Sequence, residues 1–198
     1  MENNEITFEY LNNLYIDQHK SASEISKLIS CSPNRINYWL KKYKISKRTI
    51  SEAVYIKHNP DGDPFEFISP KNLEEAKLFG LGIGLYWGEG NRANKNTVRL
   101  GNSDAALLNK FIEFLIKFFN INKKDLKFHL HTFSDINIDE ALMYWTKKLK
   151  VEKKQFYKPF VTKSGSLGTY KKKSKYGVLT VYYGNIKLKN KLISLLPL

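Results

Sequence analysis

The chain has 198 residues, a hydrophobic fraction of 42% and a net charge of +14. This composition excludes disorder over most of the chain, and the length allows one or two domains. The single cysteine excludes an internal disulfide, and four scattered histidines provide no zinc framework. We expect no signal peptide, and no apolar run in the sequence reaches the about 20 residues that a membrane span needs. We expect a cytoplasmic or nucleoid-associated protein with neither a membrane nor a small-molecule partner.

The positive charge is concentrated in one part of the sequence. Residues 147–191 hold 14 lysines and one acid, Glu152, whereas the rest of the chain carries 19 basic and 18 acidic residues. A lysine-rich surface that serves only solubility would spread its charge more evenly. The uneven distribution favours a polyanionic partner, and we expect double-stranded DNA.

Residues 6–48 show a three-helix pattern. The first helix is expected near Thr7 to Asp17, the second from Ser21 or Ser23, and the third after Ser32, with Pro33 at its first position. This pattern resembles the short helix-turn-helix modules of resolvases and sigma-like regulators. The resemblance implies that the third helix enters the major groove. Its DNA contacts would be Asn34, Arg35, Asn37 and Tyr38 to bases, and Lys41 and Lys42 to phosphates. The alternative is a small helical bundle used for protein contact.

We divide the chain into a helix-turn-helix domain at residues 1–48, a linker at 49–70 and a second domain at 71–198. The linker assignment rests on turn signals centred on Asn59 to Pro64 and on Ser69-Pro70. In the second domain we expect a helix that ends near Gly90, strands at 91–93 and 97–101, a helix capped by Ser103-Asp104 that ends near Phe119, a strand at 126–133, an inserted helix at 135–150, strands at 157–162 and 177–183, and a final helix at 185–196. This order predicts an α+β fold.

The first helix of the second domain has unusual glycine spacing. Gly80, Gly84 and Gly88 recur every four residues and share one helical face, and the helix ends on Glu89. Each glycine costs about 0.5–1 kcal/mol relative to alanine inside a helix. Three in register therefore indicate close packing against a second helix.

The end of this helix reads Gly82-Ile83-Gly84-Leu85-Tyr86-Trp87-Gly88-Glu89-Gly90. It resembles the signature helix of the LAGLIDADG homing endonucleases, and the resemblance extends over most of residues 72–196. Gly82 stands at the motif's first leucine, and Trp87 at a position that is often polar. The resemblance implies an αββαββα domain with a curved antiparallel sheet.

The family builds its site from two such helices packed side by side, and this chain has one. The resemblance therefore implies a homodimer, with an interface formed by Gly80, Gly84, Trp87 and Gly88. It assigns metal binding to Glu89 and Gly88, with Mg²⁺ or another divalent metal as cofactor. The implied activity is sequence-specific hydrolysis of double-stranded DNA. It also implies a lysine or glutamine near the attacking water, for which the candidates are Gln155, Lys158 and Lys163.

Strand alternation predicts which side chains face DNA. If Val98, Leu100, Phe128 and Leu130 are core residues, the side chains between them lie on the other face of the sheet. These are Thr97, Arg99, Lys127, His129 and His131. The expected contacts in this domain are Arg92, Arg99, Lys127, His129, His131, Lys158, Lys171, Lys172 and Lys173. The two histidines also admit a metal-binding interpretation, against exposed strand residues. The tyrosines at 157, 170, 176, 182 and 183 are assigned to sheet packing rather than base stacking.

Two functions from different classes remain open at this point. The first is a dimeric, metal-dependent DNA endonuclease in which Glu89, Lys163 and Gln155 are the catalytic candidates. The second is a transcription regulator that binds DNA through a LAGLIDADG-like domain without cleaving it. RNA processing is a further alternative.

Overall fold

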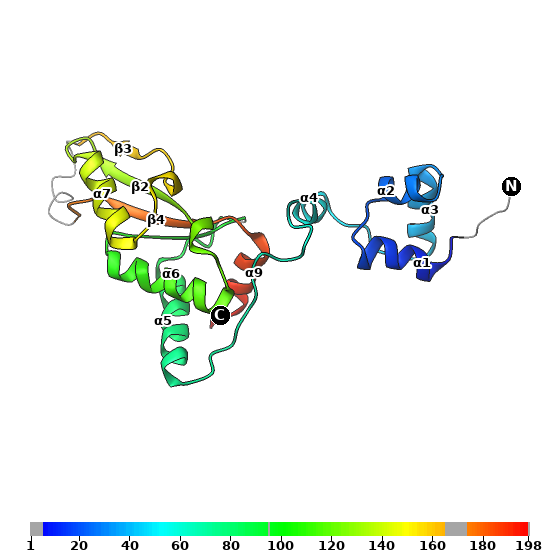
Figure 1. Cartoon of the computed structure of the whole chain (residues 1–198), viewed down its shortest axis with the longest axis horizontal. Coiled ribbons are helices and arrows are strands. Elements are labelled where there is room, and N and C mark those ends of the chain that lie inside the picture. Colours follow the sequence, from blue (N-terminus) through cyan, green and yellow to red (C-terminus); the bar gives the residue numbers. More distant parts are fainter. Residues whose placement is uncertain (1–5, 95, 165–173, 198) are drawn as a thin grey trace. The chain divides into compact units, whose positions relative to one another are not determined.

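The computed structural model describes residues 6–94, 96–164 and 174–197 (Figure 1). The chain divides into two compact units, residues 1–64 and 65–198. It is an α+β protein, because the second unit combines helices with a four-stranded sheet. Among the described residues, no helix has the length and apolar character to cross a membrane.

The first unit is helical. Its elements are α1 (Phe8–Asn12), which continues into the π-helical turn η1 (Asn13–Asp17), α2 (Ala22–Leu28), α3 (Pro33–Lys42) and α4 (Ile50–His58). The first three helical segments enclose a small core of Leu11, Leu14, Tyr15, Ile25, Ile36, Leu40 and Ile45. Local caps fix the boundaries, since the Ser21 hydroxyl accepts from the Glu24 amide and the Ser32 hydroxyl accepts from the Arg35 amide.

Helix α4 corrects the expectation of a connector after residue 48. The Thr49 hydroxyl accepts from the Glu52 amide at 3.2 Å, and the Glu52 carboxylate accepts from the Thr49 amide at 2.6 Å. This capping box starts a helix that buries none of its residues. The sequence therefore lacks the apolar stripe by which a packed helix is recognised.

Residues 65–70 pack with the second unit and are not a linker. The amides of Glu66 and Ile68 donate to the carbonyls of Phe119 and Phe118 at 3.2 and 2.9 Å. The Phe67 ring lies 5.6 Å from the Phe119 ring, centroid to centroid. The apolar residues Phe65 and Phe67 of this segment pack against the core of the second unit.

The second unit follows the expected order of elements except for the first of the five expected strands. Its elements are α5 (Leu73–Glu89), β1 (Val98–Asn102), α6 (Ala105–Phe119), η2 (Lys123–Asp125), β2 (Lys127–Phe133), α7 (Ile138–Leu149), η3 (Lys153–Gln155), β3 (Phe160–Thr162), β4 (Val178–Tyr183) and α9 (Ile186–Ser194). The strand expected at Asn91 is reduced to one antiparallel bridge between Gly90 and Leu100.

The sheet is mixed rather than antiparallel, with strand order β1-β4-β2-β3. Strand β4 pairs antiparallel with both β1 and β2, as expected, but β3 pairs parallel with β2. Helix α7 supplies the crossover that a parallel pair requires. Strand β3 is also shorter than the expected 157–162, because Pro159 has no amide to donate to a ladder.

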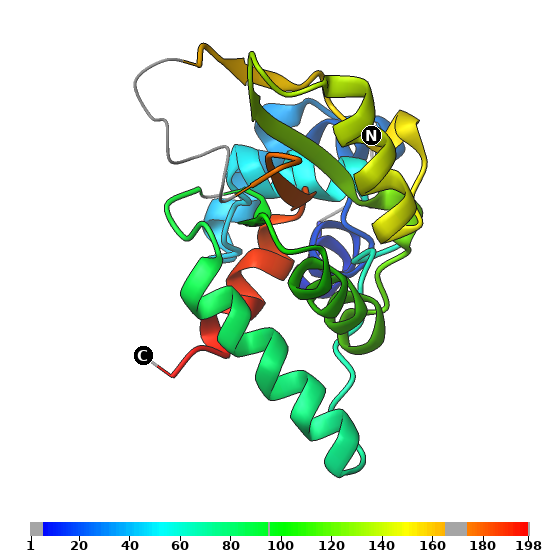
Figure 2. The ribbon, with the colours of Figure 1, turned by 90° about the vertical axis from the view of Figure 1, so that its left-hand side faces the viewer.

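The core lies between one face of the sheet and the helices. Alternate strand residues are buried there: Val98, Leu100, Phe128, Leu130, Leu179 and Val181. Aromatic residues of α6 and Trp145 of α7 complete this core, and the Trp145 indole donates to the Tyr176 carbonyl at 2.8 Å. Figures 1 and 2 both show the amino end of α5 farthest from the sheet and its carboxyl end reaching it.

Candidate active site and nucleic-acid interface

The inner face of α5 packs through Gly82. A Cβ atom at this position would lie 2.1 Å from Cγ and 2.7 Å from Cβ of Phe114 on α6. The absent side chain thus allows the α5 backbone to rest against an aromatic ring. Ile83 and Tyr86 are buried on the same side of the helix. Close packing inside the chain therefore uses Gly82, and not the three glycines spaced by four.

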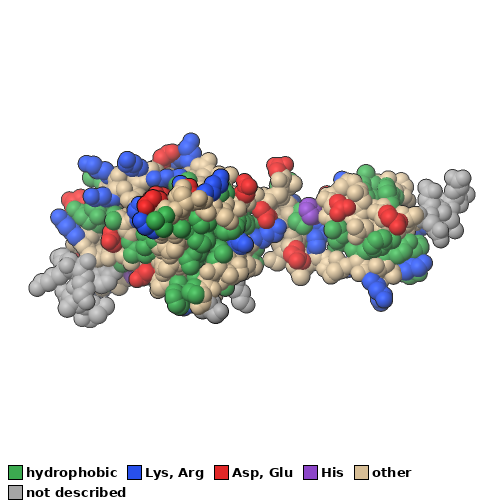
Figure 3. All heavy atoms as spheres, turned by 90° about the horizontal axis from the view of Figure 1, so that it is seen from below, with side chains coloured by type: hydrophobic (Ala, Val, Ile, Leu, Met, Phe, Trp, Pro, Cys, Tyr) green, Lys and Arg blue, Asp and Glu red, His purple; other side chains and the backbone are tan. Residues whose placement is uncertain are grey.

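The outer face of α5 is defined here by Leu73, Gly80, Leu81, Gly84, Trp87 and Gly88. A Cβ atom built on Gly80, Gly84 or Gly88 would meet no atom within 4 Å. Leu73, Leu81 and Trp87 are 70%, 46% and 45% exposed. Hydrophobic side chains reach the surface of the second unit over wide areas (Figure 3). The exposed Lys77, which pairs with Glu74 at 2.8 Å, lies on the same side of the helix between Leu73 and Leu81. The outer face is therefore open to a partner, and its carboxyl-terminal half, from Gly80 to Gly88, is apolar.

Glu89 is the last residue of α5, and its side chain is exposed. Gly90 follows it and donates its amide to the Tyr86 carbonyl at 3.0 Å. A Cβ atom on Gly90 would lie 2.6 Å from Cδ2 of Tyr86, so glycine is required for this turn. The Asn91 amide then donates to the Arg99 carbonyl at 2.9 Å. The chain consequently passes from Glu89 directly to the edge of the sheet.

The end of α5 offers oxygen ligands suited to a divalent cation. Carbonyls in the last helical turn lack intrahelical partners, and the helix dipole is negative at this end. The Gly88 carbonyl and the Glu89 carboxylate lie there, and both are hard oxygen donors of the kind that Mg²⁺ prefers. Among the described residues, no three His, Cys, Asp or Glu side chains converge on a metal site. Further ligands would have to come from water, DNA or a second copy.

Lys189 of α9 supports the turn after Glu89, and sequence reasoning did not single it out. Its side chain is 1% exposed, and Nζ donates to the Asn91 carbonyl at 2.7 Å. Burial lowers the pKa of Lys189, and the nearby Arg99 charge acts in the same direction. The only sequence signal is its place beside Leu188 and Leu192 on the buried side of an amphipathic helix.

Tyr86 lies beneath the same turn. Its ring stacks on Phe111 with a centroid distance of 6.0 Å, and Lys189 Nζ is 5.9 Å from its centroid. Among the described residues, no group forms a hydrogen bond with its buried hydroxyl. Burial raises the pKa of Tyr86 to about 12, while the charge of Arg92 acts in the opposite direction. The ring is therefore a neutral support for the backbone around Glu89.

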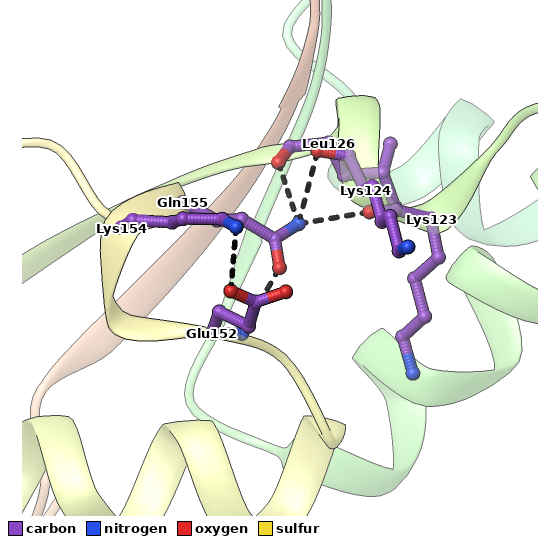
Figure 4. Close-up of polar contacts among 6 residues, drawn as sticks. All are labelled: Lys123, Lys124, Leu126, Glu152, Lys154 and Gln155. Atoms are coloured by element: carbon purple, nitrogen blue, oxygen red, sulfur yellow. Dashed lines mark hydrogen bonds and ion pairs between the residues drawn. The ribbon is translucent and has the colours of Figure 1, made fainter.

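Gln155 is a structural residue, which corrects its assignment as a catalytic candidate (Figure 4). Its side chain is buried, and Nε2 donates to the carbonyls of Lys123 and Leu126 at 2.8 and 3.0 Å. Its Oε1 atom accepts from the Glu152 amide at 3.0 Å. Both ends of the amide are therefore committed to the backbone, and neither can orient a water. Lys158 and Lys163, the other two candidates, have exposed side chains.

The open face of the sheet carries the expected basic side chains. Arg99, Lys127, His129 and His131 alternate with buried residues, which confirms the predicted alternation. The Arg99 guanidinium lies 4.9 Å from the Tyr182 ring centroid, and its Nε donates to the Thr97 hydroxyl at 2.6 Å. Arg92 is exposed, whereas Lys171, Lys172 and Lys173 lie outside the described residues.

The two histidines of β2 are held by aromatic contacts. The His131 Nε2 atom lies 2.8 Å from the Thr162 hydroxyl, and its ring contacts Phe133 and Phe160. The His129 ring meets Tyr157 and Tyr182 edge to face. These contacts and the lack of a third convergent ligand among the described residues oppose the metal interpretation.

In the first unit, α3 presents the side chains assigned to DNA. Asn34, Arg35, Tyr38, Lys41 and Lys42 are exposed, and Asn37 is half-buried. The Lys42 ammonium lies 4.3 Å from the centroid of the Trp39 ring, and this contact orients the lysine side chain along the helix.

Comparison of the chain with protein-family models, curated proteins and solved structures found no match.

Proposed function

We propose that this protein is a homodimeric, divalent-metal-dependent endonuclease that cuts double-stranded DNA at specific sequences, similar to the LAGLIDADG homing endonucleases. The observation that carries the proposal is the combination found on α5. An open glycine face runs along the helix, and an exposed carboxylate stands at its end beside a basic sheet. Each feature has a use in a paired-helix site.

Dimerisation would pair the outer faces of two α5 helices. The absent side chains of Gly84 and Gly88 allow two helix backbones to approach closely, and Leu81 and Trp87 provide apolar area at the contact. An isologous contact of this kind brings the two Glu89 residues near one symmetry axis. The DNA target would accordingly be roughly palindromic.

The residues at the end of α5 fit a metal-assisted hydrolysis. The Glu89 carboxylate and the Gly88 carbonyl would hold the divalent ion, and a bound ion would make water more acidic and offset charge on the phosphate. Lys189 and Tyr86 support the backbone that positions Glu89. The exposed Lys163 remains the candidate to act near the attacking water, and Arg92 and Lys158 are candidates for phosphate contacts.

DNA recognition would be shared between the two units. On the open sheet face, Arg99 can pair with guanine in the major groove, while Lys127 neutralises phosphate. In the first unit, Asn34, Arg35 and Tyr38 project from the start and middle of α3, where a helix-turn-helix reads bases.

The decisive experiment incubates the full-length protein with a plasmid library that carries randomised inserts, with and without Mg²⁺, and sequences the linear products. We expect metal-dependent cutting at a roughly palindromic site. Glu89→Gln should retain DNA binding and lose cleavage by at least about a hundredfold. Gly84→Leu should remain folded, sediment as a monomer and lose cleavage. A wild-type protein that cuts without added metal, or that cuts as a monomer, would contradict the proposal.

The alternative is a DNA-binding regulator that does not cleave. It is favoured by the sparse ligand set at Glu89 and by the structural role of Gln155. The same experiment separates the two functions. Specific duplex binding by a dimer, without product under any divalent metal, would favour the regulator.

A further inference from the structure

Three aromatic rings meet on the open face of the sheet. His129 lies on β2, Tyr182 on β4, and Tyr157 in the segment that leads to β3. Their ring centroids are 6.5 Å apart for His129 and Tyr157, 6.3 Å for His129 and Tyr182, and 5.9 Å for Tyr157 and Tyr182, all edge to face. In this geometry an edge meets a face, so the rings do not cover one another completely. Tyr157 is 51% exposed.

A second aromatic group continues this surface toward the edge of the sheet. Phe160 of β3 lies opposite His131 of β2, with ring centroids 5.0 Å apart. The Phe160 side chain is 57% exposed. We call Tyr157, His129, Tyr182, His131 and Phe160 the ring platform. An exposed apolar surface of this kind on a structured sheet indicates a binding surface.

The charges around the ring platform select the class of ligand. Arg99 stacks over Tyr182, Lys127 lies opposite Tyr182 in the β2–β4 register, and Lys158 follows Tyr157 in the chain. The four strands contain no Asp or Glu, and neither does the sequence from residue 153 to 191. The surface therefore complements an anion that also carries flat, apolar groups. Nucleic acid has both properties.

The exposed rings favour unpaired bases over a duplex. In a duplex, each base face is covered by its stacked neighbours, so an aromatic ring can stack only on a base that has left the helix. The register also places His129 and His131 in successive rows, about 6.8 Å apart along the strand. Stacked nucleotides rise about 3.4 Å, so bases seated on successive rows cannot remain stacked on one another.

We propose that the ring platform stacks the bases of unpaired DNA. This inference rests on the proposed function, because it takes DNA as the ligand, and it extends the substrate from paired duplex to locally opened or single strands. It also revises the assignment of Tyr157 and Tyr182 to packing alone. Tyr157 and Phe160 would provide the stacking surfaces, while Lys127 and Lys158 would hold the phosphates.

The test uses the full-length protein and a single-stranded thymidine oligonucleotide of about 20 nucleotides with 2-aminopurine at its centre. Stacking of this fluorescent base on a ring quenches its emission. We expect quenching by the wild type, and a fivefold to hundredfold weaker single-strand affinity for Tyr157→Leu, as is typical of one lost base stack. Tyr157→Phe, the matched control, should retain both affinity and quenching.

Lys158→Gln separates charge from stacking. It should weaken single-strand and duplex binding together and lower their salt dependence, while quenching at saturation stays unchanged. Equal quenching by the wild type and Tyr157→Leu would contradict the proposal that the ring platform stacks bases. If Tyr157→Leu does not fold, Phe160→Thr on the edge strand replaces it, with the same expected loss.

The proposed function fails separately from this inference. Specific duplex binding without quenching of the single strand would contradict base stacking by the ring platform and leave the proposed function intact. Absence of binding to both forms of DNA would contradict the stacking inference and the proposed function alike.

Discussion

The glycines on the two faces of α5 have different surroundings. On the inner face, Gly82 lies against Phe114, where even a methyl group would meet the ring at 2.1 Å. On the outer face, a Cβ atom on Gly80, Gly84 or Gly88 would meet nothing within 4 Å. The fold of one chain thus explains the first glycine and leaves the other three without a structural reason. Because each of these three costs helix stability, we infer that the outer face is shaped for a partner.

Gly82→Ala is expected to change the free energy of unfolding most, by lowering it. The new methyl group would overlap Cβ and Cγ of Phe114, which belong to the rigid base of that side chain and cannot swing away. Overpacking of this kind costs about 1–3 kcal/mol. Urea unfolding of the full-length protein, followed by circular dichroism, measures the change. Unchanged stability would show that α5 and α6 can move apart without penalty and that the packing of α5 on Phe114 does not require glycine at position 82.

The features that the sequence predicted are the local ones. The starts of α3 and α6 were predicted from Ser32-Pro33 and from Asp104, because a capping side chain and its amide partner lie within three residues of each other. The alternation of Val98 and Leu100 revealed the buried face of β1 for the same reason.

The missed features depend on distant partners. The only local contact of the Gln155 side chain is with the Glu152 amide, among the described residues. The carbonyls that hold its other end lie 29 to 32 residues away in the sequence, so the sequence alone does not show that the whole amide group is committed. The parallel pairing of β3 depends on where α7 returns the chain. Lys189 looks like any other lysine in a basic segment until α9 packs it beneath Asn91.

A smaller effect, of opposite sign, is expected from Tyr86→Phe on the inner face. This change removes a buried hydroxyl that has no hydrogen-bond partner among the described residues, so stability should rise by about 1 kcal/mol at neutral pH. A decrease would indicate that the hydroxyl makes a favourable interaction.

The same variant has a pH signature. The pKa of Tyr86 is about 12 in the fold and about 10 in an unfolded chain. The unfolded state therefore loses its proton first as the pH rises above 10, and the wild type loses stability between pH 10 and pH 12. Tyr86→Phe should lose less over this range, which denaturant titrations at several pH values would reveal.

Gly84→Ala tests the outer face with the same substitution as Gly82→Ala. A methyl group here meets no atom of its own chain, so the isolated subunit should become more stable by about 0.5–1 kcal/mol through helix propensity. Unfolding must be measured at a concentration where the wild type sediments as a monomer. A loss of stability comparable to that of Gly82→Ala would mean that Gly84 packs within the chain.

The smallest effect on the isolated subunit is expected from Trp87→Gln, and its value lies in separating folding from association. The indole is 45% exposed, and a surface substitution usually changes stability by no more than about 0.5 kcal/mol. If the outer face pairs two subunits, however, the same change removes a large aromatic contact from the interface, and such contacts are frequent hot spots there.

Sedimentation of Trp87→Gln over a concentration series should then show weaker association, while unfolding of the dilute monomer remains as in the wild type. A monomer destabilised by more than about 1 kcal/mol would assign Trp87 to the core of its own chain. Unchanged stability with unchanged association would leave the outer face without its proposed occupant, because the residue would then matter to neither process.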